Sequence, residues 1–245
     1  MKYNFMLKCC VVAVALLLCF ACREENDARY IVLYGDSITA EYGAPEGSYT
    51  QLVQQKFHAD TVYRHGYCGH RYSRDVSAAH GGPSWLGTYV GEVCSHADAD
   101  LIILFAGTND YGHGMPLGEP GDTATTTSCG GLQYILDYLI EHTDAPVMLC
   151  TPFPNGAVHR LSTMPNEQGH AMADYVAAYK AVAAQERYRG RVYVNDTFAR
   201  CGFSPEDEVV DSIRVYTTDG LHLSAAGYDR LTDLQHSYYK DAMAQ

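Results

Sequence analysis

The chain has 245 residues and a formal net charge of −12, with 29 acidic against 17 basic residues. This length is enough to bury one large hydrophobic core. The negative charge repels nucleic acid phosphates and anionic lipid headgroups. The composition therefore argues against nucleic acid as a partner, and it favours a neutral or cationic partner or a substrate that binds in a local pocket.

An export signal is predicted at the N-terminus. Two lysines precede an unbroken apolar run from Cys9 to Cys22, which is too short to span a bilayer but typical of a signal-peptide core. The end of this run resembles a bacterial lipobox, although Cys19 stands where Leu is usual. We therefore predict a lipoprotein signal peptide over residues 1–21 and lipidation of Cys22, with an ordinary cleaved signal as the alternative.

A short acidic tether, residues 22–27, follows the predicted cleavage site and resembles the surface-export signal of Bacteroidota lipoproteins. The leader holds two basic residues and no acidic one, so the net charge without it is about −14. Residues 28–245 contain no Pro- or Ser-rich linker and no repeat, which predicts one domain. We expect the lipid to anchor this domain in the cell envelope, at the outer-membrane surface or in the periplasm, with no other membrane contact.

After the leader, short apolar runs alternate with segments of helical spacing. The first run contains β-branched residues and ends before Gly35, and the strongest is DLIILFA, which ends before Gly107. In chain order, strands are predicted over residues 28–33, 61–63, 100–106, 145–150 and 191–194. Helices are predicted over residues 49–57, 85–94, 132–140, 168–187 and 225–243. Continuous apolar strands between amphipathic helices indicate a parallel sheet with helices on both faces.

Export would also permit disulfide bonds. Apart from Cys22, the predicted mature chain has an odd number of cysteines, so at least one thiol is free or pairs between chains. These cysteines are Cys68, Cys94, Cys129, Cys150 and Cys201. His65 and His70 flank Cys68, but no second ligand pair stands at zinc spacing, so no metal site is predicted.

Polar or glycine-rich segments stand where ligands bind in such a fold, beyond the carboxyl ends of the strands. They are GDS after the first strand, GYCG after the second, GTND after the third and DGLH before the last helix. Taken singly, each has a structural explanation, such as a helix N-cap for Ser37 or a turn for Asp219. Taken together, they fit one chemistry.

A serine hydroxyl becomes a nucleophile when a base takes its proton. His222 is the candidate base for Ser37, and Asp219, three residues before it, can hold the imidazole in the correct tautomer. The tetrahedral oxyanion then needs donors, which the backbone N–H groups of Ser37 and Gly69 and the amide of Asn109 can supply. A helix that began at Ser37 would add its dipole. This set predicts a serine hydrolase that needs no cofactor.

The same segments resemble the conserved blocks of the SGNH, or GDSL, hydrolase family. GDSIT matches the first block, with Ser37 as the nucleophile, and GTND matches the third, which places Asn109. DGLHLS matches the last block, which places Asp219 and His222. The resemblance covers nearly all of the predicted mature chain in order and spacing.

The second block is a variant. HGYCGH places the oxyanion glycine at Gly69, but Arg64 and Cys68 stand where the family usually has Asn and Ser. The family resemblance implies a flavodoxin-like three-layer α/β/α sandwich with a mainly parallel, five-stranded sheet. It also implies ester hydrolysis without a metal.

The α/β-hydrolase scaffold is excluded by its nucleophile motif. That scaffold requires G-x-S-x-G. In GDSIT and GPSWL the final position is Thr39 or Leu86. Ser37 is therefore predicted to be both a helix cap and the nucleophile of an SGNH-type site.

The substrate is less well defined by the sequence. Residues 111–128 and 198–218 could shape the pocket, and neither segment has a long apolar run for a fatty acyl chain. Most of the 20 tyrosines are expected in the core, and exposed ones could stack on sugar rings. We predict hydrolysis of a short-chain ester, an acetyl ester, on a carbohydrate or similar polar substrate. A lysophospholipase or thioesterase, or a glycan-binding lipoprotein without turnover, are the alternatives. Candidate substrate contacts are Asp36, Asp110, Tyr111 and His113.

Overall fold

The computed structural model describes residues 28–46, 48–75, 84–154, 162–202 and 215–244. Its strands are β1 (Tyr30–Gly35), β2 (Thr61–Gly66), β3 (Leu101–Phe105), β4 (Val147–Cys150) and β5 (Val192–Asn195). They form one parallel sheet in the order β2-β1-β3-β4-β5. The predicted five-stranded parallel sheet is confirmed, whereas the predicted leader, the tether and Cys22 lie outside the described residues.

Every predicted helix has a counterpart. The main helices are α2 (Ser48–Lys56), α3 (Val90–Cys94), α5 (Ser128–His142), α6 (Met172–Ala183) and α9 (Ala225–Ala242). The short elements are η2 (Leu86–Thr88), α4 (Thr108–Gly112), η3 (Glu186–Tyr188) and α7 (Thr197–Arg200). The helix predicted over 168–187 begins later, because Gly169 is left-handed (φ 81°) and the Asp174 carboxylate accepts a bond from Ala171 N (2.8 Å) at the helix start.

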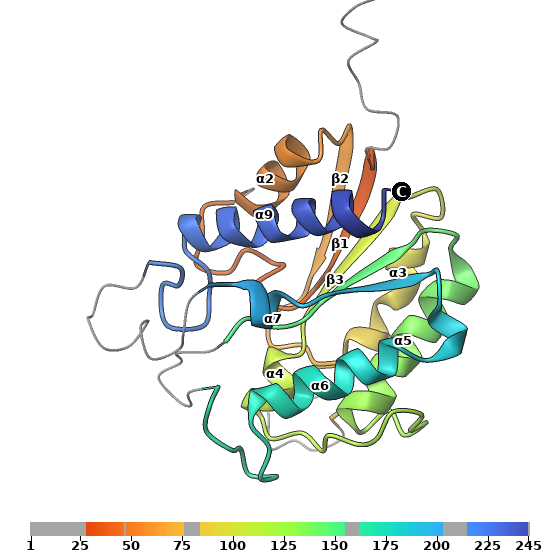
Figure 1. Ribbon diagram of the computed structural model, residues 1–245, viewed down its shortest axis with the longest axis vertical. Coiled ribbons are helices and arrows are strands. Elements are labelled where there is room, and N and C mark those ends of the chain that lie inside the picture. Colours follow the sequence, from red (N-terminus) through yellow and green to blue (C-terminus); the bar gives the residue numbers. More distant parts are fainter. Residues whose placement is uncertain (1–27, 47, 76–83, 155–161, 203–214, 245) are drawn as a thin grey trace, which may run out of the picture.

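Helices cover both faces of the sheet (Figure 1). Side chains alternate along each strand, so Val32 and Tyr34 of β1 point to one face while Ile31 and Leu33 point to the other. The first face packs against α3, α5 and α6, and the second packs against α2 and α9. Each fully buried aliphatic side chain contributes about 1.5–3 kcal/mol. The result is the three-layer α/β/α sandwich that the sequence predicts.

The loops that carry the candidate site leave the same edge of this sheet. Gly35, the last residue of β1, lies level with Gly66 of β2 and with Phe105 of β3. A Cβ on Gly35 would lie 2.0 Å from the Phe105 carbonyl oxygen, and one on Gly66 would lie 2.3 Å from Ala40 N. Only glycine therefore lets the loop after β1 pack directly against the ends of β2 and β3.

The five cysteines in the described part of the chain are all free thiols. Burial raises the pKa of the Cys129 and Cys150 thiols to about 12, so neither forms a thiolate at neutral pH. Among the described residues, no helix has the length and apolar character needed to cross a membrane.

Candidate active site

The candidate nucleophile lies in a tight turn at the end of β1. Ser37 is buried, with 5% of its surface exposed. Ala40 N donates to the Asp36 carbonyl (2.9 Å), and Tyr42 N donates to the Ser37 carbonyl (3.0 Å). Glu41 then takes a left-handed backbone conformation (φ 62°), which ends the right-handed turn. The prediction that Ser37 caps a helix is therefore wrong, because no helix begins at Ser37 in the described part of the chain.

His222 and Asp219 approach Ser37 from the loop before α9. His222 Nε2 lies 3.1 Å from Ser37 Oγ, and His222 Nδ1 lies 2.6 Å from Asp219 Oδ2. Asp219 Oδ1 also accepts the backbone N–H groups of Leu221 (2.9 Å) and His222 (2.8 Å). The three side chains form one chain of hydrogen bonds from carboxylate to imidazole to hydroxyl, the arrangement that activates a serine.

Short-range contacts hold the loop that carries this pair. Thr217 and Leu223 form an antiparallel bridge, and Thr218 N donates to the His222 carbonyl (2.8 Å). Gly220 N donates to Thr217 Oγ1 (3.1 Å), and a φ of 88° at Gly220 suits glycine. The loop is thus a small closed unit that sets the spacing of aspartate and histidine by itself.

The electrostatics of this pair keep the Asp219 carboxylate ionised beside the His222 ring. Burial alone would raise the pKa of Asp219, but hydrogen bonds from the His222 ring and from backbone N–H groups outweigh it, so this pKa is lowered. Asp219 is therefore ionised at neutral pH and accepts the proton on Nδ1. The Nε2 lone pair of His222 then faces the Ser37 hydroxyl.

Two glycines follow β2, and their surroundings differ. Gly66 is packed against the turn that carries Ser37, as described above. Gly69 is left-handed (φ 73°), and apart from its chain neighbours no atom of the described residues lies within 4 Å of the place where its Cβ would be. The open space beside Gly69 favours it over Gly66 as the residue whose backbone faces a ligand.

Asn109 lies in α4, directly after β3. Its side chain is half-buried, and Nδ2 donates to the His70 carbonyl (3.0 Å). An amide nitrogen carries two N–H donors, so this bond orients the group and leaves a second donor for a ligand. Because His70 follows Gly69, the same bond ties the two candidate oxyanion donors together.

Asp110 adds buried hydrogen bonds between α4 and the loop after β2. Its side chain is fully buried and accepts bonds from Tyr72 N (2.9 Å), Ser73 N (2.9 Å) and Ser128 Oγ (3.0 Å). Burial raises the pKa of Asp110, although these hydrogen bonds oppose the shift. With its oxygens engaged inside the fold, Asp110 holds the loop after β2 in place, which argues against the predicted contact with substrate.

Asp36, next to the nucleophile, is also buried, with 1% of its surface exposed. Its Oδ1 accepts the N–H of Ile38 (3.0 Å), whereas Oδ2 has no hydrogen-bond partner within the part of the chain that the structure describes. Burial, together with the nearby charge of Asp110, raises the pKa of Asp36 to about 7. Asp36 therefore titrates near neutral pH inside the fold, and its burial argues against direct substrate binding.

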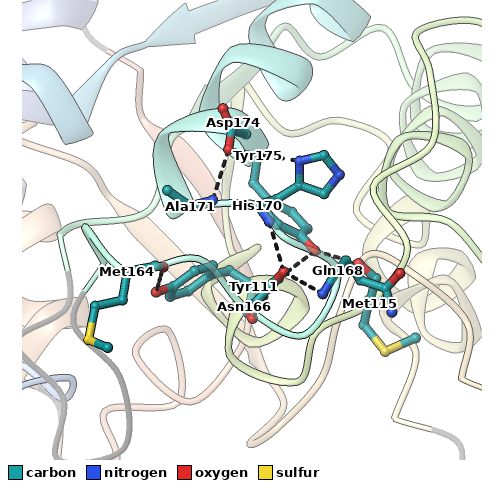
Figure 2. A network of polar contacts seen from close by, with 9 residues as sticks. All are labelled: Tyr111, Met115, Met164, Asn166, Gln168, His170, Ala171, Asp174 and Tyr175. Atoms are coloured by element: carbon teal, nitrogen blue, oxygen red, sulfur yellow. Dashed lines mark hydrogen bonds and ion pairs between the residues drawn. The ribbon is translucent and has the colours of Figure 1, made fainter.

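A buried polar network contacts α4 through Tyr111 (Figure 2). Asn166 Nδ2 donates to the Tyr111 carbonyl (3.2 Å) and to Tyr175 Oη (2.9 Å), and its Oδ1 accepts from Gln168 N (3.0 Å) and His170 N (3.2 Å). Tyr111 is fully buried, and its hydroxyl donates to the Met164 carbonyl (2.8 Å). The predicted role of Tyr111 as a substrate contact is therefore replaced by a structural one.

The remaining residues that the sequence singled out do not belong to this network. His113 follows α4, is half-buried, and donates its backbone N–H to the Asn109 carbonyl (3.0 Å). Most of the predicted pocket segment 198–218, namely residues 203–214, lies outside the described residues. His65 Nε2 faces His96 Nε2 (2.9 Å), whereas His70 Nδ1 faces the Cys68 carbonyl (3.1 Å). Within the described ranges, no cluster of three or more His, Cys, Asp or Glu is arranged to hold a metal.

Two features of the site are not evident in the sequence. The first is Tyr42, whose exposed ring lies beside the His222 imidazole, with 4.7 Å between ring centroids. The second is the buried Glu41, whose Oε2 pairs with the Arg64 guanidinium (2.8 Å). In the second block, Arg64 stands where the family usually has asparagine. This arginine is the sequence signal that could have indicated a carboxylate partner such as Glu41.

Comparison with protein families gives a match to the GDSL-like Lipase/Acylhydrolase family over residues 33–230, a range that includes every residue of the candidate site. A comparison with curated proteins gives no match.

Several solved structures share the fold. A protein from Lactobacillus plantarum is 23% identical, with 89% of this chain and 99% of that chain covered and a TM-score of 0.71. A possible lipase from Chitinophaga pinensis is 18% identical, with 88% and 99% covered and a TM-score of 0.65. A carbohydrate acetylesterase from Sinorhizobium meliloti is 19% identical, with 86% and 98% covered and a TM-score of 0.58.

Proposed function

Because this chain belongs to the GDSL-like lipase/acylhydrolase family and is an ester hydrolase, we propose that it removes an acetyl or similarly short acyl group from a carbohydrate or similar polar substrate. Ser37 is the nucleophile, His222 the general base and acid, and Asp219 the residue that orients the imidazole. The observation that carries this proposal is the chain of hydrogen bonds from Asp219 through His222 to Ser37 Oγ, at 2.6 and 3.1 Å.

The acylation step follows from this geometry. Ser37 Oγ attacks the ester carbonyl carbon while His222 Nε2 takes the hydroxyl proton. The ionised Asp219 stabilises the imidazolium that forms. The imidazolium then gives this proton to the alcohol oxygen as the bond between that oxygen and the former carbonyl carbon breaks. The carbonyl double bond re-forms, the alcohol leaves, and the acyl group remains on Ser37. Water, activated by the same imidazole, hydrolyses this acyl-enzyme and restores the hydroxyl.

The negative charge on the carbonyl oxygen is stabilised by fixed donors. In this proposal they are the backbone N–H groups of Ser37 and Gly69 and the second N–H of Asn109 Nδ2. Donors that are already in place need no reorganisation during the reaction, and each is worth about 10²–10³-fold in kcat. The buried bonds of Asp110 to the loop after β2 keep two of these donors at a fixed separation.

Three observations support a short acyl group on a polar substrate. The segment after Asn109 is rich in Gly, Pro and Thr and offers no long apolar run. An exposed tyrosine stands beside the imidazole. A carbohydrate acetylesterase is among the structures with a similar fold. An acetylated glycan outside the cell also suits the export and lipid anchoring that we propose from the N-terminal sequence.

Hydrolysis of acetyl, butyryl and octanoyl p-nitrophenyl esters tests this proposal. We expect the highest kcat/KM for the acetyl ester, loss of turnover in Ser37→Ala, and no loss in the control Ser95→Ala, which changes an exposed serine. Preference for the octanoyl ester would favour a lysophospholipase or thioesterase. Absence of turnover with these esters and with acetylated sugars would contradict the proposal and favour a glycan-binding role.

A further inference from the structure

An exposed aromatic ring lies beside the imidazole of the candidate active site. Tyr42 has 58% of its surface exposed, whereas the side chain of His222 is only 14% exposed. The two ring centroids are 4.7 Å apart, and the ring planes are inclined by 49°. Tyr42 therefore covers part of the imidazole and offers the rest of its surface to solvent or to a ligand.

The backbone that carries this ring is firmly held. Tyr42 N donates to the Ser37 carbonyl (3.0 Å), which links it to the nucleophile turn. The preceding Glu41 is 4% exposed; its Oε2 pairs with Arg64 (2.8 Å), and its Oε1 accepts from Thr50 N (2.8 Å). A buried carboxylate and a left-handed non-glycine residue both cost free energy. The turn that places Tyr42 is thus braced from two neighbouring elements, so the ring is positioned before any ligand binds.

The reaction itself decides which part of the ester lies beside this ring. His222 Nε2 gives its proton to the departing alcohol, so the alcohol oxygen must come within hydrogen-bond reach of Nε2. The carbonyl oxygen, in contrast, must face the donors at Gly69 and Asn109. The alcohol part therefore lies on the imidazole side of Ser37, where Tyr42 stands, and the ring borders the alcohol.

We propose that Tyr42 forms the subsite for the alcohol part of the ester and selects cyclic alcohols, such as a sugar ring, over open-chain ones. This inference rests on the proposed function and adds the class of alcohol to it. A flat aromatic ring buries more apolar surface against another ring than against a short open chain. The selection then depends on an aromatic ring at this position and not on the tyrosine hydroxyl.

The ratio of kcat/KM for cyclic esters over kcat/KM for an open-chain ester measures this selectivity directly. Acetate release is followed with cyclohexyl acetate and a monoacetylated methyl glucoside as cyclic esters, and with 2-propyl acetate as the open-chain secondary ester. The ratio of kcat/KM for cyclic over open-chain ester is expected to fall about 3- to 10-fold in Tyr42→Ala, mainly through KM. Tyr42→Phe and Tyr42→Trp should keep the ratio of the wild type.

Tyr134→Ala is the matched control, because Tyr134 is also an exposed tyrosine (39%) but lies on α5, away from His222. Its ratio should equal that of the wild type. An equal loss on cyclic and open-chain esters in Tyr42→Ala would overturn the inference, since the ring would then only support the imidazole. Unchanged kcat/KM for both kinds of ester would overturn it as well, since the ring would then contribute nothing to binding of the alcohol. Lack of Ser37-dependent acetate release from any of these esters would instead remove the proposed function, and the inference with it.

Discussion

The two arms of the site are held in opposite ways. The acid–base arm, residues 217–223, is fixed by hydrogen bonds among its own residues. The oxyanion arm, residues 66–73 with 107–112, is fixed by bonds between residues 37 to 39 positions apart. Asn109 Nδ2 donates to the His70 carbonyl, and the backbone N–H of Tyr72 donates to the Asp110 carboxylate. A short motif therefore encodes the first arm, whereas the second depends on the whole fold.

The largest expected effect tests the acid–base arm. Asp219→Asn should lower kcat about 10³- to 10⁴-fold, because a neutral amide neither stabilises the imidazolium nor fixes the Nδ1–H tautomer. The melting temperature should change little, because the arm is partly exposed and closed by its own backbone bonds. Asp144→Asn, a change of an exposed aspartate, is the control and should keep full activity. A loss below tenfold would mean that the local geometry does not serve catalysis.

A pH-dependent effect on stability is expected at Asp36, the buried neighbour of Ser37, whose pKa is raised by burial and by the charge of Asp110. The pKa of Asp36 in the folded state, about 7, exceeds the unfolded value of 3.8, so ionisation destabilises the fold as pH rises from 4 to 7. Asp36→Asn should remove this loss, which is about 4 kcal/mol because one pKa unit corresponds to about 1.4 kcal/mol. Urea unfolding at pH 4.5 and 8 measures about 3 kcal/mol of this loss, because Asp36 of the unfolded chain is already largely ionised at pH 4.5.

The exposed Asp98→Asn is the control for this measurement and should follow the wild type at both pH values. If the free energy of unfolding depended on pH equally in the wild type and Asp36→Asn, ionisation of the buried Asp36 would not be what destabilises the fold.

The next effect concerns catalysis by the oxyanion arm. Asn109→Ala should lower kcat about 10²-fold with little change in KM, because the lost N–H acts on the transition state and not on the bound ester. Steady-state kinetics with the acetyl ester separate the two constants. A loss that appears only in KM would place Asn109 in ground-state binding, and an unchanged kcat would remove it from the site.

The smallest effect on rate, a few-fold fall in kcat, is expected at Asn166, which contacts the oxyanion arm through the Tyr111 carbonyl. Asn166→Ala removes the buried bonds that its side chain donates to the Tyr111 carbonyl and to the Tyr175 hydroxyl, so it should lower the free energy of unfolding by about 2–4 kcal/mol. Gln168→Ala is the control, because Gln168 is exposed and joins the network by its backbone N–H. If Asn166→Ala left both stability and kcat unchanged, long-range bracing of this arm would be refuted.

Much of the fold could be predicted from the sequence. The LIILF part of the DLIILFA run is buried on both faces of the sheet, so it shows no alternation and is typical of a central parallel strand. The short helices α4 and α7 were not predicted, because four or five residues carry too little periodicity for a helix.

The same contrast explains what could be predicted of the site. Asp219 and His222 are three residues apart in one hairpin, so their partnership is visible in DGLH. Gly69 could be separated from Gly66 only by its surroundings, namely packed backbone at one glycine and open space at the other. The helix cap at Ser37 was predicted wrongly because the left-handed Glu41, held by Arg64 and Thr50, diverts the chain. Such a conformation has no local signal in the sequence.

Covalent trapping of the nucleophile tests the central claim most directly. Diethyl p-nitrophenyl phosphate transfers its phosphoryl group to an activated serine, and peptide mass spectrometry locates the adduct. We expect one adduct per chain, on Ser37, with simultaneous loss of esterase activity, and no adduct in His222→Ala. An adduct on another residue, or esterase activity that survives full modification of Ser37, would contradict the account.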